Sequence, residues 1–204
     1  MKFYKYLSLS LICIYSCSKV DDTSSTPVIE NQMTDSRDGQ VYETITIGAQ
    51  TWFAENLNYD TEDETSRCYK DDPANCFSYG RLYEGETAQT ICPEGWHLAS
   101  EDEWQALFDY LGGTEVAHVF LAPYGKQQDE PIGFNLLSGG RFFANFQFIA
   151  ARGYYYTSTE GGLANSYKYM TFSPGESVSL NATASSAIMH SCRCIQDSSL
   201  SSGE

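Results

Sequence analysis

The alternation of apolar and polar residues predicts where the folded region begins. Across residues 41–47, Val41, Ile45 and Ile47 share one face of an extended chain, and the intervening residues lie on the other. Such a period of two is typical of a strand that is buried on one face. A Gly-Ala pair can then turn the chain, so that residues 50–54 return beside the first strand. We therefore expect a β-hairpin at this end of the domain.

A change from period two to helical spacing predicts the principal helix. Ser100 and Glu103 have the spacing of a capping box, in which each side chain bonds the backbone of the other. The apolar stripe that follows, at i, i+3, i+4 and i+7, comprises Trp104, Leu107, Phe108 and Leu111. Two glycines end this helix. Shorter helices are expected over residues 114–121, before a proline, and over residues 84–90.

The second half of the chain predicts strands and turns. Aromatic and β-branched residues occur there in short segments separated by glycine, which is typical of strands. The expected strands span residues 134–137, 141–148, 153–158, 167–172, 178–180 and 187–195. One or two helices between a hairpin and a strand-rich half predict an α+β fold, with the helices packed on twisted antiparallel sheets.

The first residues have the layout of a secretory signal. Lys2 and Lys5 precede a short apolar run from Leu7 to Tyr15, which is too short to span a bilayer and is followed by the small residue Ser16. We expect residues 1–16 to be a signal peptide. Residues 14–17 resemble the lipobox of bacterial lipoproteins, in which the cysteine is acylated, so Cys17 is the predicted lipidation site. Alternatively, an ordinary signal peptidase cleaves here and Cys17 is only a nearby thiol.

A polar segment separates this cysteine from the predicted domain. Residues 17–35 are expected to form a flexible tether, residues 36–197 the domain, and residues 198–204 a polar tail. Residues 18–22 resemble the acidic export signal that some outer-membrane lipoproteins carry after their cysteine; a solvated linker is the alternative. We thus expect a cell-envelope protein, held in the outer membrane by two or more acyl chains.

The net charge excludes one class of partner. The full chain has a net charge of −15, and residues 1–16 contain two lysines and no acidic residue, which leaves −17 without them. Nucleic acid requires a basic face, and anionic lipid does likewise. We therefore expect no nucleic-acid partner, and membrane contact through the lipid anchor alone.

The cysteines point to disulfides and the histidines argue against a zinc site. Five cysteines lie beyond Cys17, and an exported protein meets an oxidising compartment. The residues alone leave their pairing open. No C-x-x-C is present and the histidines are scattered, so no metal or cofactor is expected. Acidic residues between Asp60 and Asp72 offer oxygen ligands for calcium, although a solvated loop is the simpler interpretation.

Several motifs in one order resemble a known family. Glycines, aromatic residues and cysteines recur along residues 36–196. The motifs are Asp38-Gly39, Ile47-Gly48-Ala49-Gln50-Thr51-Trp52, Ala54-Glu55-Asn56-Leu57, Tyr79-Gly80-Arg81-Leu82-Tyr83, Cys92-Pro93-Glu94-Gly95-Trp96-His97-Leu98 and Arg193-Cys194. Together they resemble the Fibrobacter succinogenes major paralogous (FISUMP) domain family. The family occurs in exported and lipid-anchored bacterial proteins, and it is similar in layout to the C-type lectin-like and formylglycine-generating-enzyme folds.

The resemblance has implications for the cysteines. Lectin-like domains tie a cysteine before their G-x-H-L segment to one in the last strand, which implies a Cys92–Cys194 bond here. Cys68 and Cys76 enclose a short loop and are expected to pair locally. Cys192 departs from the family pattern. It can be a buried thiol, a rival partner for Cys92, or part of an intermolecular bridge.

Binding is better supported than catalysis. Nucleophile and base candidates, His97 among them, have no recognisable spacing. Tyr154, Tyr156 and Tyr167 are candidate ligand contacts, because tyrosine supplies rigid amphipathic surface; the alternative is that they pack the sheet. We expect a non-catalytic binding module for a glycan or protein ligand. The alternatives are an enzyme acting on envelope polysaccharide or protein, and a purely structural envelope protein.

Overall fold

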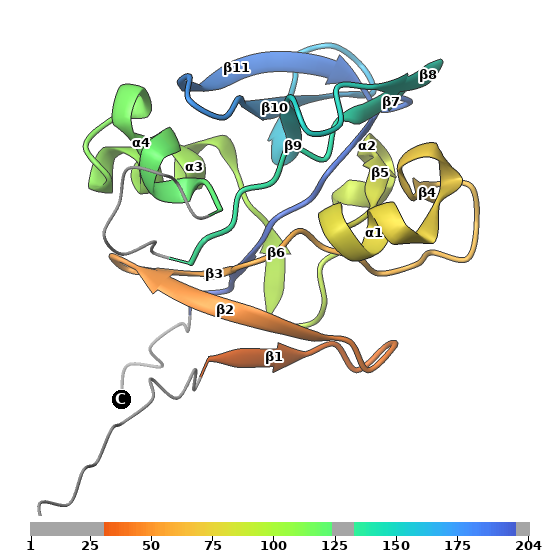
Figure 1. Cartoon of the computed structure of the whole chain (residues 1–204), viewed down its shortest axis with the longest axis horizontal. Helices are drawn as coiled ribbons and strands as arrows, with labels where there is room; N and C mark the ends of the chain where they lie inside the picture. The colour runs from red at the N-terminus through yellow and green to blue at the C-terminus, as the bar shows by residue number, and fades with distance from the viewer. Residues whose placement is uncertain (1–30, 124–132, 199–204) are drawn as a thin grey trace, which may run out of the picture.

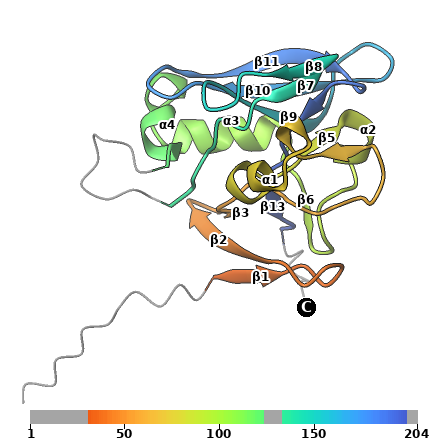
Figure 2. The same ribbon diagram turned by 45° about the vertical axis from the view of Figure 1, so that its right-hand side comes forward.

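Three antiparallel sheets and the helices beside them make up the described part of the chain, residues 31–123 and 133–198 of this computed structural model. The opening strands lie at one end of the molecule and the long strands of the second half at the other (Figure 1). Helices α3 (Glu101–Tyr110) and α4 (Thr114–Leu121) lie on one side, and α1 (Pro73–Tyr79) and α2 (Gly85–Ala88) on the opposite side (Figure 1). The turned view shows the first two strands below the helices (Figure 2). No helix in these residues is both long and apolar enough to cross a bilayer.

The first sheet joins the start of the domain to its end. Its spatial order is β1 (Gln32–Thr34), β2 (Val41–Ile47), β3 (Gln50–Phe53), β13 (Cys194–Gln196) and β6 (Trp96–Leu98). The predicted hairpin is therefore present as β2 and β3. Ile195 of β13 lies opposite Trp52 of β3 and also opposite His97 of β6. One short strand near the C-terminus thus holds two distant segments together.

The other two sheets come mainly from the second half of the chain. The three-stranded sheet has the order β11 (Val178–Ser185), β10 (Ser166–Phe172) and β9 (Gly153–Glu160). The third has the order β4 (Ser66–Arg67), β5 (Leu82–Glu84), β12 (Met189–His190), β7 (Arg141–Phe143) and β8 (Asn145–Gln147). Together with the helices, these sheets confirm the predicted α+β class.

Of the four helices described, α1 and α3 begin at a side-chain cap. They are α1 (Pro73–Tyr79), α2 (Gly85–Ala88), α3 (Glu101–Tyr110) and α4 (Thr114–Leu121). The predicted capping box of α3 is present: Ser100 Oγ accepts from Glu103 N at 3.2 Å, and Glu103 Oε2 accepts from Ser100 N at 2.8 Å. Helix α1 was not predicted, although its signal is in the sequence, because Asp72 caps the helix directly before Pro73.

The core is built around aromatic side chains. Trp52 and Trp104 are fully buried, with ring centroids 4.8 Å apart, and Phe134 packs against both rings. This cluster joins the apolar stripe of α3 to the hairpin and to β10 and β11. A second cluster on the far side of the first sheet includes Tyr42, which is 1% exposed. Both faces of the hairpin are therefore in contact with core residues.

The domain begins earlier than predicted. Residues 32–34 were expected in the flexible tether, but they form β1, where Met33 lies opposite Tyr42 of β2. Asp35 is fully buried and binds the Arg37 guanidinium at 2.6 Å. The prediction failed because only one large apolar side chain marks this strand. Cys17 and most of the predicted tether lie outside the described residues, as do residues 199–204.

Three predicted strands differ in the structure. Residues 134–137 are not a strand: Phe134 and Leu136 are buried, but Asn135 has a positive φ of 51°, which interrupts an extended chain. Residues 141–148 form the hairpin β7–β8, with Ala144 at the turn. Residues 187–195 divide into β12 and β13, which belong to different sheets.

Both expected disulfides are present. Cys92 and Cys194 are bonded across a sequence separation of 102 residues, and Cys68 and Cys76 across 8. Among the described cysteines, Cys192 alone is free, and it is fully buried. Burial raises the pKa of its thiol, which therefore stays protonated. Of the three interpretations of Cys192, this placement matches the buried thiol.

Candidate functional site

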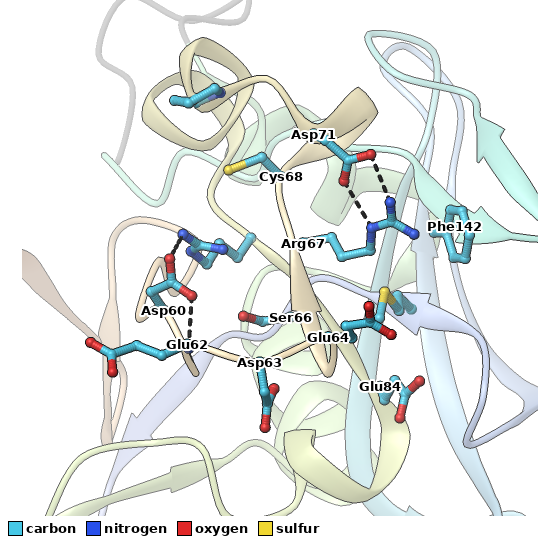
Figure 3. A pocket seen from close by; sticks show the side chains of 13 residues that line it. Asp60, Glu62, Asp63, Glu64, Ser66, Arg67, Cys68, Asp71, Glu84 and Phe142 are labelled. Atoms are coloured by element: carbon cyan, nitrogen blue, oxygen red, sulfur yellow. Dashed lines mark hydrogen bonds and ion pairs between the residues drawn. The ribbon is translucent and has the colours of Figure 1, made fainter.

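A hollow with a volume of about 720 Å³ is lined by six carboxylates among its thirteen residues (Figure 3). We call it the acidic groove. Its wall comes from the loop before β4, from β4 and β5, and from the segment that leads into α1. The lining residues are Asp60, Glu62, Asp63, Glu64, Ser66, Arg67, Cys68, Asp71, Pro73, Arg81, Glu84, Phe142 and Met189.

Negative charge predominates in the acidic groove. Six carboxylates and two guanidinium groups line it. Both guanidinium groups are engaged: Arg67 binds Asp71 at 2.6 Å, and Arg81 is paired with Asp60. The hydrogen bond from Arg67 to Asp71 raises the pKa of the arginine further. The remaining carboxylates leave the groove with an excess of four negative charges.

Three of these carboxylates have no partner within the described residues. Glu62, Glu64 and Glu84 take part in no side-chain hydrogen bond or ion pair there. The backbone N–H of Glu84 donates to Thr65 O at 2.9 Å, so β5 holds Glu84 beside the acidic loop. The groove thus presents three acidic side chains that have no partner among the described residues and attract cationic groups.

The loop that carries the acids is held by its own hydrogen bonds. Asp63 Oδ1 accepts from Thr65 N at 2.8 Å and from the hydroxyls of Thr65 and Thr61. These bonds lower the pKa of Asp63, which is exposed to solvent. The loop is therefore an ordered turn, and Ser66 then continues it into β4 with its side chain buried.

One wall of the acidic groove is apolar. The Arg67 guanidinium carbon lies 4.7 Å from the Phe142 ring centroid and 5.3 Å from that of Phe146. Met189 lines the groove beside them. An extended ligand can therefore contact an aromatic surface as well as carboxylates.

Calcium binding finds no support in this loop. The described residues contain no group of three or more histidine, cysteine, aspartate or glutamate side chains arranged to hold a metal ion. Figure 3 shows Glu62 and Asp63 pointing away from each other. A calcium site needs six to eight converging oxygens, and the acids of this loop do not converge.

Two of the predicted ligand contacts are interior residues. Tyr154 is 3% exposed and Tyr156 is fully buried. The Tyr156 hydroxyl donates to Ile188 O at 2.7 Å, and both rings pack on His190. The expectation that Tyr154 and Tyr156 face a ligand is thus corrected, because β9 has core residues on both of its faces. Tyr167 is partly exposed, with its hydroxyl 3.1 Å from Glu86, and stays a candidate.

The histidines are placed for structural roles. His97 Nδ1 lies 2.6 Å from Asp197 and Nε2 lies 2.8 Å from Glu103, so both ring nitrogens are engaged by carboxylates. Partial burial lowers the pKa of His97, but these two bonds outweigh burial and raise it overall. His190 is fully buried. Neither residue lines the acidic groove, so neither is placed to act as a base there.

Sequence analysis missed the structural role of Arg193. Its guanidinium is fully buried and donates to Phe53 O at 2.9 Å, to Phe134 O at 2.7 Å and to the Asn56 side chain at 2.7 Å. It also donates to Asn135 O at 3.0 Å. A charged residue between Cys192 and Cys194, in a segment that the sequence predicts to be a strand, was the available signal.

A comparison with family models identified one match. The model described as the Fibrobacter succinogenes major domain matches residues 45–196, which is most of the chain. Neither the search of curated proteins nor the search of solved structures found a match. The C-type lectin-like assignment therefore stays a prediction.

Proposed function

The chain belongs to the Fibrobacter succinogenes major domain family, and from this premise we propose that it is a lipid-anchored binding module of the cell envelope. Its ligand is a protein partner that presents a cationic segment, and this segment occupies the acidic groove. The resemblance of residues 14–17 to a lipobox supports the anchor, and the charge of the acidic groove supports the ligand.

The unpaired carboxylates of the acidic groove carry the proposal. Their like charges repel one another, and a ligand with lysine or arginine side chains relieves this repulsion. Exposed charges of one sign also increase association rates with oppositely charged partners, by an effect that salt screens. Between the two predicted ligand classes, the excess negative charge favours a basic protein segment over a neutral glycan.

The same geometry argues for binding over catalysis. General acid–base or nucleophilic catalysis requires a base within hydrogen-bond reach of the group that it activates. The lining contains no histidine, and its serine, Ser66, is buried and bonded to Thr61, which argues against a serine nucleophile. Its carboxylates can act as general acids and bases, so the test below also measures turnover of envelope polysaccharide.

A pull-down from solubilised envelope tests this function. The purified full chain serves as bait in three forms: wild type, Glu64→Gln/Glu84→Gln, and the control Glu94→Gln/Glu176→Gln. The control removes the same charge from exposed positions outside the groove. We expect a basic protein to be captured by the wild type and the control, but not by the groove variant. Equal capture by all three, or turnover of envelope polysaccharide by the chain, would contradict the proposal.

A further inference from the structure

A second hollow lies between the β1–β2 turn and α1. Its volume is about 260 Å³, and it is separate from the acidic groove, with which it shares no lining residue. Gln40 and Val41 line it from the start of β2, Glu55 and Asn58 from the segment after β3, and Phe77 from α1. The hollow is smaller than the roughly 300–1,000 Å³ typical of drug-sized ligands, which suits a single small ring.

The lining of this hollow is mostly uncharged and rich in amides. Asn58 Nδ2 donates to Gln40 Oε1 at 3.3 Å, and the Tyr42 hydroxyl accepts from both Gln40 Nε2 and Asn58 N. These bonds orient the two amides before any ligand arrives. Asn58 Oδ1 is buried and has no hydrogen-bond partner among the described residues. This oxygen is closed to solvent, whereas the amide nitrogens of Asn58 and Gln40 each keep one N–H without a partner among the described residues.

Glu55 supplies the one charge in the lining. Its Oε1 accepts from Glu43 N at 2.9 Å, which fixes the carboxylate on the rim. No bond to its second oxygen occurs within residues 31–123 and 133–198. A carboxylate oxygen accepts strongly from hydroxyl donors. The hollow therefore combines a strong acceptor with amides that both donate and accept.

Phe77 gives the hollow an exposed aromatic wall. Its side chain is 92% exposed, the largest exposed fraction among the large apolar residues described. The backbone that carries this ring is held in place, because the neighbouring Cys76 is bonded to Cys68 and Asp72 caps the start of α1. A ring so exposed beside a polar hollow contributes little to the core. It offers a flat apolar surface to a ligand.

We propose that this hollow binds one neutral sugar unit. Sugar rings have an apolar C–H face, which stacks on an aromatic ring, and hydroxyl edges, which bond to amides and carboxylates. Phe77 provides the ring, and Gln40, Asn58 and Glu55 provide the edge contacts. The site goes beyond the proposed binding of a basic partner and does not depend on it, since the two hollows share no lining residue.

Titration of the full chain with four methyl glycosides tests the site. The probes are the methyl glycosides of glucose, galactose, mannose and N-acetylglucosamine, observed by saturation-transfer NMR. We expect at least one to bind in the millimolar range. Phe77→Ala and Glu55→Gln should each weaken this binding at least tenfold, and Phe143→Ala, another exposed phenylalanine outside the hollow, should leave it unchanged.

Two results would overturn the site. One is that none of the four glycosides gives a signal at 20 mM with the folded wild type. The other is that Phe77→Ala binds as the wild type does. Circular dichroism of the variants separates loss of the site from loss of the fold. Neither result tests the acidic groove. The groove variant Glu64→Gln/Glu84→Gln changes no residue that lines this hollow.

Discussion

His190 makes the stability of the fold sensitive to acid. The ring is fully buried among Tyr154, Tyr156 and Tyr169, and neither nitrogen has a hydrogen-bond partner among the described residues. Burial, and to a lesser degree the Arg141 charge, lowers its pKa from 6.5 to about 3. His190 is therefore protonated at a higher pH in the unfolded chain than in the folded chain. As a result, the free energy of unfolding falls as the pH drops below about 6.5.

Replacement of His190 should remove this acid sensitivity. At about 1.4 kcal/mol per pH unit, the histidine costs the wild type about 2–3 kcal/mol between pH 6.5 and 4.5. We expect His190→Phe to retain that stability, as measured by urea unfolding at each pH. If the free energy of unfolding fell equally with decreasing pH in the variant and the wild type, His190 would have to be hydrated in the native state.

His97 should act in the opposite direction. The net effect of its surroundings is a raised pKa, so its stabilisation is complete below about pH 6.5 and is lost as the pH rises through the folded-state value. His97→Gln should therefore unfold with less pH dependence than the wild type between pH 6.5 and 8. Below pH 6.5, His97→Gln serves as a control for His190→Phe. There its free energy of unfolding should change with pH as that of the wild type does.

Arg193 stabilises the interior through neutral acceptors. Truncation to Met removes the donor from four acceptors, three of them buried: Phe53 O, Phe134 O and the Asn56 side chain. We expect Arg193→Met to lower the free energy of unfolding by about 3–5 kcal/mol. Arg152→Met, at an exposed arginine, should cost about 0.5 kcal/mol or less. A loss below 1 kcal/mol for Arg193→Met would mean that water replaces the guanidinium.

At the level of elements, the two disulfides should contribute unequally. In the chain-entropy model the stabilisation grows with the length of the closed loop, and the separations are 102 and 8 residues. Removal of Cys92–Cys194 by paired alanines should cost about 4–5 kcal/mol, and removal of Cys68–Cys76 about 2–3 kcal/mol. Chemical unfolding of the two double variants measures both losses; equal losses would contradict the model.

Elements with local signals were predictable from sequence. The Ser100 cap and the stripe through Trp104 define α3 within one short segment, and the hairpin β2–β3 shows its own alternation. Pairing between distant strands is not encoded locally. Residues 187–195 look like one strand, yet β12 and β13 find partners in different sheets. The tyrosines of β9 were misplaced for a similar reason, since β9 is covered on both faces.

The candidate sites were predictable only in part. The acids between Asp60 and Asp72 are visible in the sequence, but Glu84 and Phe142 join them because β12 pairs with both β5 and β7 in the third sheet. The second hollow brings Gln40, Glu55 and Phe77 together from three segments. Such sites depend on tertiary contacts, which the spacing of apolar and polar residues along the chain does not predict.

For the whole molecule, the proposed anchor determines where binding takes place. Cys17→Ser removes the residue that would be acylated, and we expect this variant to be released into the soluble fraction after cell lysis. The wild type should sediment with the outer membrane and incorporate labelled palmitate. Ser16→Ala keeps a small residue before Cys17 and serves as the control. Membrane retention of Cys17→Ser would exclude this anchor.

The charge of the acidic groove is the central claim, and direct titration tests it. A fluorescent lysine octapeptide is added to the full chain at 50 and 500 mM NaCl, and its anisotropy is followed. The account predicts saturable binding at low salt, weakened at least tenfold at high salt. It also predicts weakening at least fivefold in Glu64→Gln/Glu84→Gln, but not in Glu94→Gln/Glu176→Gln. Absence of binding at low salt, or equal affinity in all three proteins, would contradict it.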